Sequence, residues 1–155
     1  MSDLIQQLQK EHNVLAGALA SLEKSRYSQE QTRAVLDKIK TLLLTHLQKE
    51  DLRLYPVLHA EAESNHVLER QLQYLAKDME KITTKVFVFF DKYDRHEFKK
   101  LEFIMDLAEL TSMLNRRLHV EETVLYTEYD RLMKRKVEQE DRKKGIIYRI
   151  KQVFS

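Results

Sequence analysis

The stretch THLQKEDLRLYPVL, residues 45–58, decides how the chain is interpreted. Apolar residues recur through it at helical spacing, yet His46 and Glu50 fall on the stripe that should be buried. Two side chains four residues apart on a helix are neighbours, with about 5–6 Å between their Cβ atoms. A protein core excludes such groups unless something pairs with them. The stretch therefore predicts either a metal ion or an internal salt bridge inside a helical protein.

The composition of the whole chain narrows its class. Two glycines and one proline in 155 residues argue against a β-sandwich, a barrel or a Gly-rich phosphate loop. A net charge of +2 gives no indication of nucleic acid, and the absence of cysteine excludes disulfides, zinc fingers and thiol chemistry. Because the chain has no long apolar run, we expect no signal peptide, no membrane span and a cytoplasmic location.

Four segments of the sequence have the apolar spacing of helices, and they begin near residues 2, 28, 64 and 94. Ser28 with Gln31, and Asp94 with Glu97, are spaced as capping boxes for the second and fourth helices. The second helix should loosen near Pro56, which cannot donate a backbone hydrogen bond. Connections this short favour antiparallel neighbours. We predict an all-α fold, an antiparallel up-down-up-down four-helix bundle with a short C-terminal extension.

The bundle should occupy residues 1–140, and residues 141–155 form a tail in which basic and apolar side chains are mixed. Three interpretations of this tail, which ends in IIYRIKQVFS, are open. It could be a final helical turn or two packed across the bundle, a basic amphipathic piece that contacts a membrane or a partner, or a disordered end.

A shift of 71 residues maps the second predicted helix onto the fourth. Glu50 falls on Glu121, and each glutamate stands one turn before a Leu-Tyr pair. A carboxylate that is repeated inside a helical bundle is typical of two-metal sites. His12, at the edge of the first helix's apolar stripe, and His66, near the start of the third helix, add two nitrogen donors. The tyrosines of the two pairs, Tyr55 and Tyr126, lie beside the core stripe and are expected to be packing residues.

Four elements, EHNVLAGAL, HLQKEDLRLYP, NHVLERQL and HVEETVLY, resemble the sequence of hemerythrin-like proteins, the His-His-Glu cation-binding domain, from about residue 4 to residue 130. The resemblance implies one or two non-haem iron ions. In that family, a histidine of the first helix and a His-x-x-x-Glu of the second serve one iron, and a histidine of the third with a similar pair on the fourth serve the other. His12, His46 and Glu50 match this pattern, His66 matches by its order, and Glu121 matches by the repeat.

The sequence departs from this pattern at Arg117, which occupies the repeat position of His46 where the family has a histidine. Arginine cannot ligate a cation, and its fixed charge repels one. His119 and Glu122 would supply the missing pair only if the helix were locally distorted. In the alternative interpretation no metal is bound, and Arg117 forms a buried salt bridge to Glu121 and across the bundle to Glu50.

Three functions are compatible with these residues. The first is a hemerythrin-like iron protein with an incomplete or asymmetric site, for which the resemblance implies O₂ or another small diatomic ligand and a role in oxygen, redox or nitric-oxide sensing or in iron handling. The second is a metal-free bundle that acts on a protein partner as an interaction or regulatory module, with Arg117 in place of a metal ligand. The third, an oxidase-type enzyme, is disfavoured because such sites use more carboxylates and an open coordination position. No catalytic residue is assigned, and we expect a binding or sensor protein rather than an enzyme.

Overall fold

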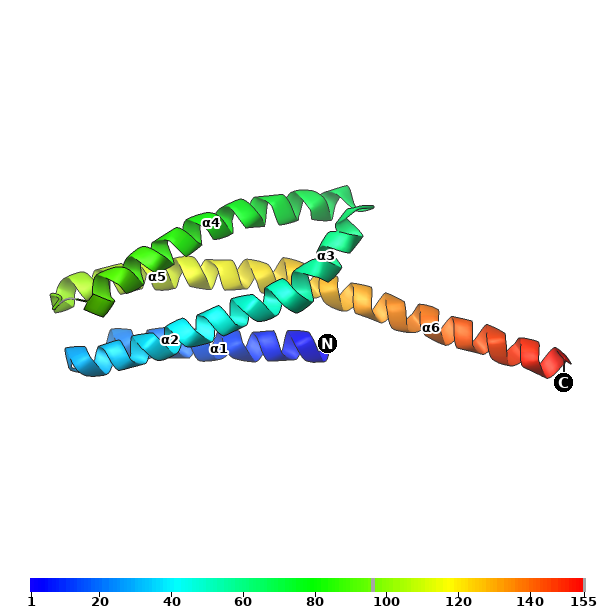
Figure 1. Cartoon of the computed structure of the whole chain (residues 1–155), viewed down its shortest axis with the longest axis horizontal. Coiled ribbons are helices and arrows are strands. Elements are labelled where there is room, and N and C mark those ends of the chain that lie inside the picture. Colours follow the sequence, from blue (N-terminus) through cyan, green and yellow to red (C-terminus); the bar gives the residue numbers. More distant parts are fainter. Residues whose placement is uncertain (96, 155) are drawn as a thin grey trace.

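The computed structural model describes residues 1–95 and 97–154, and within these ranges every regular element is a helix. Short π-helical segments, labelled η, interrupt two of the helices. In chain order the elements are α1 (Asp3–Lys24), α2 (Gln29–Lys49), η1 (Glu50–Leu54), α3 (Tyr55–Ala62), α4 (His66–Arg95), α5 (Lys100–Val120), η2 (Glu121–Tyr126) and α6 (Thr127–Phe154). They form four antiparallel rods: α1, then α2–η1–α3, then α4, then α5–η2–α6 (Figure 1). The predicted up-down-up-down four-helix bundle is confirmed.

Local signals explain where α1 and α2 begin. The hydroxyl of Ser2 accepts a hydrogen bond from the backbone N–H of Ile5, and Ser28 forms the predicted capping box with Gln31. The prediction of a second box at Asp94 was wrong, because Asp94 lies inside α4 and α5 begins only at Lys100. The aromatic side chains near the end of α4 are buried against α5, and this packing extends the helix past the predicted turn.

Two apolar clusters make up the core, one towards each end of the bundle. The first cluster holds the bundle together near the α1–α2 and α4–α5 connections, and its buried members are Leu15, Leu19, Leu22, Leu36, Ile39, Leu43, Ile82, Phe89, Phe90, Tyr93, Phe103, Leu107, Leu110 and Leu114. The second lies near the α3–α4 connection and consists of Leu4, Ile5, Leu8, Leu54, Leu58, Ala62, Leu68, Leu72, Leu75, Leu125, Tyr126, Tyr129 and Leu132. Each fully buried leucine contributes about 1.5–3 kcal/mol to stability.

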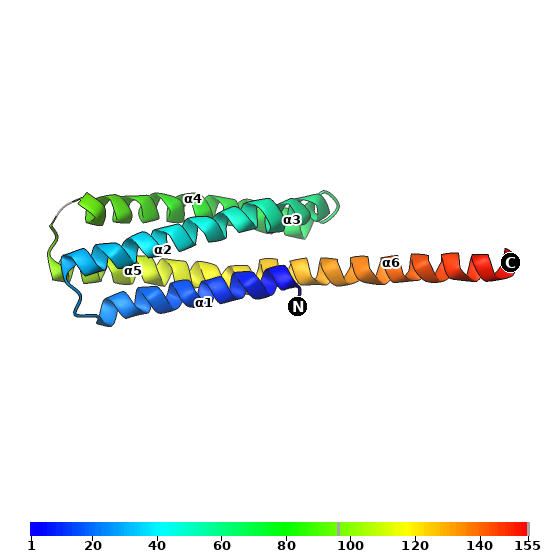
Figure 2. The same ribbon diagram turned by 60° about the horizontal axis from the view of Figure 1, so that its bottom comes forward.

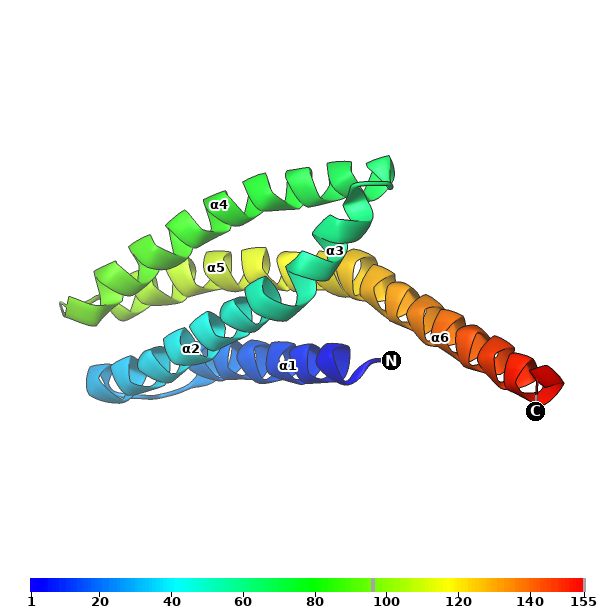
Figure 3. The ribbon, with the colours of Figure 1, turned by 45° about the vertical axis from the view of Figure 1, so that its right-hand side comes forward.

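The last helix, α6, continues well beyond the other three rods (Figures 2 and 3). Its last buried residue is Leu132, and every described residue from Lys134 to Phe154 is exposed. The interpretation that the tail packs across the bundle was therefore wrong, and so was that of a disordered end. Residues 134–144 are charged or polar except Val137, so this part of the helix has no apolar face to pack. None of the described helices is long and apolar enough to cross a membrane.

Candidate metal centre

A layer of polar side chains separates the two apolar clusters. It consists of His12 from α1, His46 and Glu50 from the α2–η1 rod, and Arg117 and Glu121 from the α5–η2 rod. Each of these residues is only 1–3% exposed. Buried charged and polar groups are strongly unfavourable unless they pair with one another or with an ion. The contacts inside the layer therefore decide what it can do.

The two π-helical segments place the repeated residues of this layer. Segment η1 begins at Glu50 and η2 begins at Glu121, at equivalent positions of the 71-residue repeat. A π-turn contains one residue more than an α-turn, so it changes the direction of the side chains that follow. As a result each tyrosine of the repeated Leu-Tyr pairs points across the layer. The phenol of Tyr126 reaches Glu50 Oε1 at 2.8 Å, and that of Tyr55 lies 3.1 Å from Arg117 Nη2.

The rings of His12 and His46 face each other through their Nε2 atoms, which are 3.0 Å apart. The other nitrogen of each ring contacts a carboxylate at the rim of the layer. His12 Nδ1 is 2.9 Å from Glu122 Oε1, and His46 Nδ1 is 2.8 Å from Glu11 Oε2. Carboxylates in this position hold the proton on Nδ1 and aim the Nε2 lone pair inward, as they do behind metal-bound histidines.

This arrangement of protons leaves two lone pairs facing each other across 3.0 Å, which is repulsive unless a proton or a cation lies between them. Two carboxylate oxygens stand close by. Glu50 Oε1 is 3.3 Å from His46 Nε2, and Glu121 Oε2 is 3.4 Å from His12 Nε2. One donor atom from each of these four residues lies within 4.8 Å of the other three. The four residues thus form a compact set of two nitrogen and two oxygen donors.

The donor set fits a transition-metal cation. Two nitrogens that each bond one ion at about 2.1 Å lie about 3.0 Å apart when the bonds meet at a right angle, and that is the separation of the two Nε2 atoms. Two imidazoles and a carboxylate at right angles are the ligand set of many non-haem iron sites, whereas zinc prefers tetrahedral angles. The residues present therefore suit a transition-metal cation.

Charges around the layer shift the protonation of its members. Burial by itself lowers the pKa of His46, but the hydrogen bond and negative charge of Glu50, together with Glu11, outweigh burial and hold this pKa above its ordinary value. Burial raises the pKa of Glu121, yet His12 and Arg117 keep it below the ordinary value. Burial and the two nearby glutamates raise the pKa of Tyr126 far above its usual range, so its phenol stays protonated and donates to Glu50.

Arg117 organises the other side of the layer. Its Nε donates to Glu121 Oε1 at 2.6 Å, its Nη1 donates to the Leu75 carbonyl at 2.9 Å, and Nη1 also lies 3.6 Å from Asp78 Oδ2. The predicted pairing with Glu121 is present. The predicted contact with Glu50 is replaced by the contact with Asp78, because Glu50 turns toward Tyr126 and His46.

We call His12, His46, Glu50 and Tyr126 the histidine half of the layer, and Arg117, Tyr55 and Asp78 the arginine half. Glu121 belongs to both, since one of its oxygens contacts Arg117 and the other faces His12.

The structure does not bring the other predicted ligands into the layer. His66 is the first residue of α4, its side chain is 85% exposed, and its ring contacts Glu69 instead. The reason is its phase, since the buried leucines of α4 define a face about 150° away from His66 and no π-turn near it changes that direction. His119 is exposed on the last turn of α5. Segment η2 brings in Glu122 rather than His119, and Glu122 lies behind His12 rather than among the four donors.

Around the histidine half, three contributors were not predicted from the sequence. Glu11 and Lys49 form an ion pair at the rim, where Glu11 also contacts His46. The signal for Glu11 was present, because it falls on the apolar stripe of the first helix, three residues after Leu8. The phenol of Tyr126 was expected only to pack, and its polar contacts depend on the π-turn.

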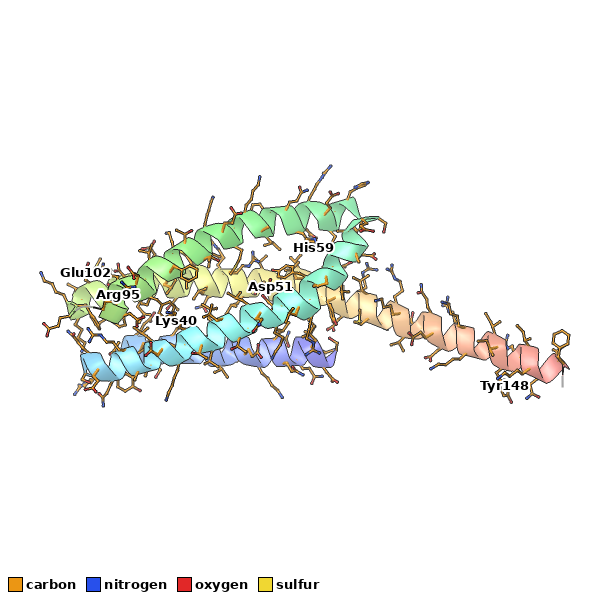
Figure 4. The ribbon with its side chains drawn as sticks, in the orientation of Figure 1. Lys40, Asp51, His59, Arg95, Glu102 and Tyr148 are labelled. Atoms are coloured by element: carbon orange, nitrogen blue, oxygen red, sulfur yellow. The ribbon has the colours of Figure 1, made fainter. Side chains whose placement is uncertain are left out.

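A groove of about 530 Å³ leads from the surface to the arginine half. It runs between the η1–α3 segment and α4, and Figure 4 labels Asp51 and His59 along the first of these. Its lining residues are Asp51, Tyr55, His59, Leu72, Ala76, Met79, Glu80, Thr83, Thr84 and Arg117.

The fold and the site together define a four-helix-bundle protein with a buried His₂Glu₂ cluster of the kind that holds a cation. The chain belongs to the hemerythrin family, since the family model described as the hemerythrin HHE cation binding domain matches residues 3–129. The resemblance seen in the sequence is thereby confirmed. The match ends within the first turn of α6. Comparison with curated proteins and with solved structures found no match.

Proposed function

We propose that this chain binds a single divalent cation, iron, through His12, His46, Glu50 and Glu121. The observation that carries the proposal is the pair of Nε2 atoms 3.0 Å apart, each belonging to a ring whose other nitrogen is held by a carboxylate. Membership of a cation-binding family supports it.

The charges of the layer favour one ion over two. With both histidines neutral, the buried members carry two negative carboxylates and one positive guanidinium, which leaves one negative charge to be compensated. Arg117 already neutralises Glu121, and it occupies the position from which the family's second iron takes a nitrogen ligand. A second ion beside this guanidinium would meet a fixed positive charge on a side chain that is only 3% exposed, and the two would repel each other.

Each residue has a defined task in this proposal. His12 and His46 supply nitrogen, Glu50 and Glu121 supply oxygen, and Glu11 and Glu122 hold the two rings in the correct tautomer. Tyr126 donates a hydrogen bond to Glu50 Oε1, the oxygen that faces His46, and so holds this carboxylate at the site. Bound ferrous iron would supply a redox-active centre with affinity for O₂ or nitric oxide.

The role we infer is oxygen, nitric-oxide or redox sensing, or iron handling, in the cytoplasm. The groove beside Tyr55 and Arg117 supports a small ligand, because it brings solvent close to a layer whose own residues are buried. Glu121 connects this side to the histidine half.

Anaerobic loading with ferrous iron, followed by desalting and metal quantification, tests the proposal. We expect about one iron per chain in the wild type and less than about 0.2 in His46→Ala, since a site of this type needs both imidazoles. The loaded protein should melt at a higher temperature, because a ligand that binds only the folded state stabilises it by mass action. Nitric oxide should change the optical spectrum of the loaded wild type.

The matched control is His59→Ala, which removes an exposed histidine from α3 outside the donor set. It should load like the wild type. Iron below about 0.2 per chain in the wild type, or equal loading of His46→Ala and wild type, would refute the proposal. A loading near two per chain would refute the single-ion assignment alone.

A second candidate function is a metal-free interaction module, and the contacts of Arg117 favour it. The guanidinium pairs with Glu121, the Leu75 carbonyl and Tyr55, so one half of the layer is satisfied without any ion. For such a module the melting temperature would stay the same when ferrous iron or a chelator is added. A melting temperature that falls on chelation and recovers with iron selects the metal-binding function instead.

A further inference from the structure

The exposed part of α6, from Lys134 to Phe154, contributes no buried side chain to the core and no donor to the centre, and it reaches the bundle through the ion pair of Arg135 with Glu61 of α3. It lies beyond the residues matched by the family model, beyond the last buried side chain and outside the donor set. Figure 4 shows its side chains extending on all sides with no other helix beside them. This segment is nevertheless patterned, and the pattern is strongest in its last four turns.

A stripe of apolar side chains runs along the last three turns of the helix. With 100° between successive residues, the five members of the stripe fall within an arc of about 120°. Their exposed fractions range from 52% to 85%. Single exposed apolar residues are ordinary, but an uninterrupted apolar face on an isolated helix marks a contact surface. The apolar stripe consists of Ile146, Ile147, Ile150, Val153 and Phe154.

Basic residues border the apolar stripe on both sides. From residue 142 to residue 154 the helix carries five positive side chains and no acidic one. The acidic residues of the exposed part of this helix lie earlier, in the segment EQED at 138–141. Positive charge and apolar surface are thus concentrated in the same turns. The basic residues are Arg142, Lys143, Lys144, Arg149 and Lys151.

We infer that residues 142–154 dock on an anionic lipid surface, with the apolar stripe among the upper acyl chains and the basic residues at the lipid phosphates. A helix of this type lies in the plane of the interface, since apolar burial and the attraction of each Lys or Arg to anionic headgroups act together. Long basic side chains can keep their charge at the headgroups while their methylene groups remain in apolar surroundings.

Other occupants fit the segment less well. Parallel pairing of two copies along the stripe would place Lys143 opposite Lys143, one turn before the apolar residues. Nucleic acid would be bound through phosphate contacts, for which five exposed apolar residues, Phe154 among them, have no use. A lipid interface uses both properties of the segment. The inference does not depend on metal binding.

Cosedimentation of the full chain with vesicles tests it. We compare vesicles of phosphatidylcholine alone with vesicles in which about a third of the lipid is phosphatidylserine. Partitioning to the anionic vesicles should be at least about ten-fold stronger and should fall steeply when the salt is raised to about 0.5 M. Neutralising Arg142, Lys143 and Lys144 together to glutamine should weaken it by more than about ten-fold. The matched control neutralises Lys10, Lys24 and Lys38, three exposed lysines of the bundle, and should bind like the wild type.

A second pair of variants tests how much the apolar stripe contributes to vesicle binding. Ile150→Ser with Phe154→Ser should weaken binding to anionic vesicles by about ten-fold or more, since each buried methylene contributes to interfacial affinity. Tyr148→Ser removes a 64% exposed aromatic ring from the opposite face of the same helix and should change binding less than about two-fold. Circular dichroism confirms that each variant keeps the bundle.

Three outcomes would overturn the inference. They are equal binding to both kinds of vesicle, tight binding to duplex DNA that survives Ile150→Ser with Phe154→Ser, and a dimer in solution that those two substitutions dissociate. Each outcome assigns the segment to a different occupant or to none.

Discussion

The histidine half and the arginine half of the polar layer are built on one repeat, yet they carry opposite chemistry. His46 and Arg117 occupy equivalent positions, as do Glu50 and Glu121, and both glutamates begin a π-helical segment. In one half, lone pairs and a carboxylate oxygen converge on a common point. In the other, a guanidinium already stands among its acceptors.

This difference shows that one side chain determines whether a half of the layer can bind a cation. A histidine presents a lone pair toward the centre, and the same position filled by arginine presents only N–H donors and a permanent charge. The arginine half is therefore stable without an ion, whereas the histidine half has facing nitrogens that need a proton or a cation between them. The two tyrosines strengthen the contrast, since each belongs to the rod that supplies the key residue of the other half. Tyr126 contacts Glu50 and Tyr55 contacts Arg117.

The largest expected effect is the loss of stability when the central residue of the arginine half is removed. Arg117→Ala leaves Glu121 buried without its cation, and the loss of one partner from a buried pair costs about 3–5 kcal/mol. In the same chelator-containing buffer, His46→Ala should cost less, about 1–3 kcal/mol, because Glu50 keeps its hydrogen bond from Tyr126. Urea unfolding followed by circular dichroism measures both. Arg116→Ala, a change at the exposed neighbour, should stay within about 0.5 kcal/mol of the wild type.

A smaller effect should separate the two tyrosines. Tyr126→Phe removes a fully buried hydroxyl that donates to a charged carboxylate, and hydrogen bonds of this kind contribute about 1.5–3 kcal/mol. Tyr55→Phe removes a hydroxyl that lines the groove, where water can replace it beside Arg117, so the loss should stay below about 1 kcal/mol. Equal losses in urea unfolding would show that the groove is as dry as the histidine half.

Much of this comparison was accessible from the sequence. The bundle followed from apolar spacing and short connections. Glu50 and Glu121 were selected from the buried stripes and the repeat, His46 from its stripe beside Glu50, and His12 from the edge of the first stripe and the family pattern. Periodicity succeeds for these residues because a regular helix fixes which face a side chain occupies. Arg117 was identified by the same repeat, and its pairing with Glu121 follows from a separation of four residues on a helix.

The rest depends on features that a regular helix does not encode. The π-turns at Glu50 and Glu121 change the direction of Tyr55 and Tyr126. A π-turn has no residue type that would allow it to be predicted from the sequence. The contact of Arg117 with Asp78 rather than Glu50 is decided by the distance between rods, which the sequence does not give. His66 was chosen from its order in the family pattern against its helical phase, and the phase proved decisive.

The smallest expected effect concerns the carboxylates that lie behind each half, and it rests on the proposed metal site. Glu11→Gln removes the negative charge behind His46 Nδ1 and disrupts the ion pair with Lys49. Such partners orient a ligand and raise its basicity, so the affinity for ferrous iron should fall by about ten-fold. Asp78→Asn makes the matched change behind Arg117, where the contact is 3.6 Å and partly exposed, and it should alter the affinity less than about two-fold. Competition with a coloured chelator under anaerobic conditions measures both constants.

The direction of this last difference matters more than its size. If Asp78→Asn weakened iron binding as strongly as Glu11→Gln, the ion would have to interact directly with the charges of the arginine half. The two halves could then not be separate in function. Any weakening beyond about two-fold in Asp78→Asn would point the same way, because a guanidinium that has lost the charge of its partner repels the ion more. Only an effect confined to Glu11 is consistent with a centre in which His46 holds the ion and Arg117 holds Glu121 in place.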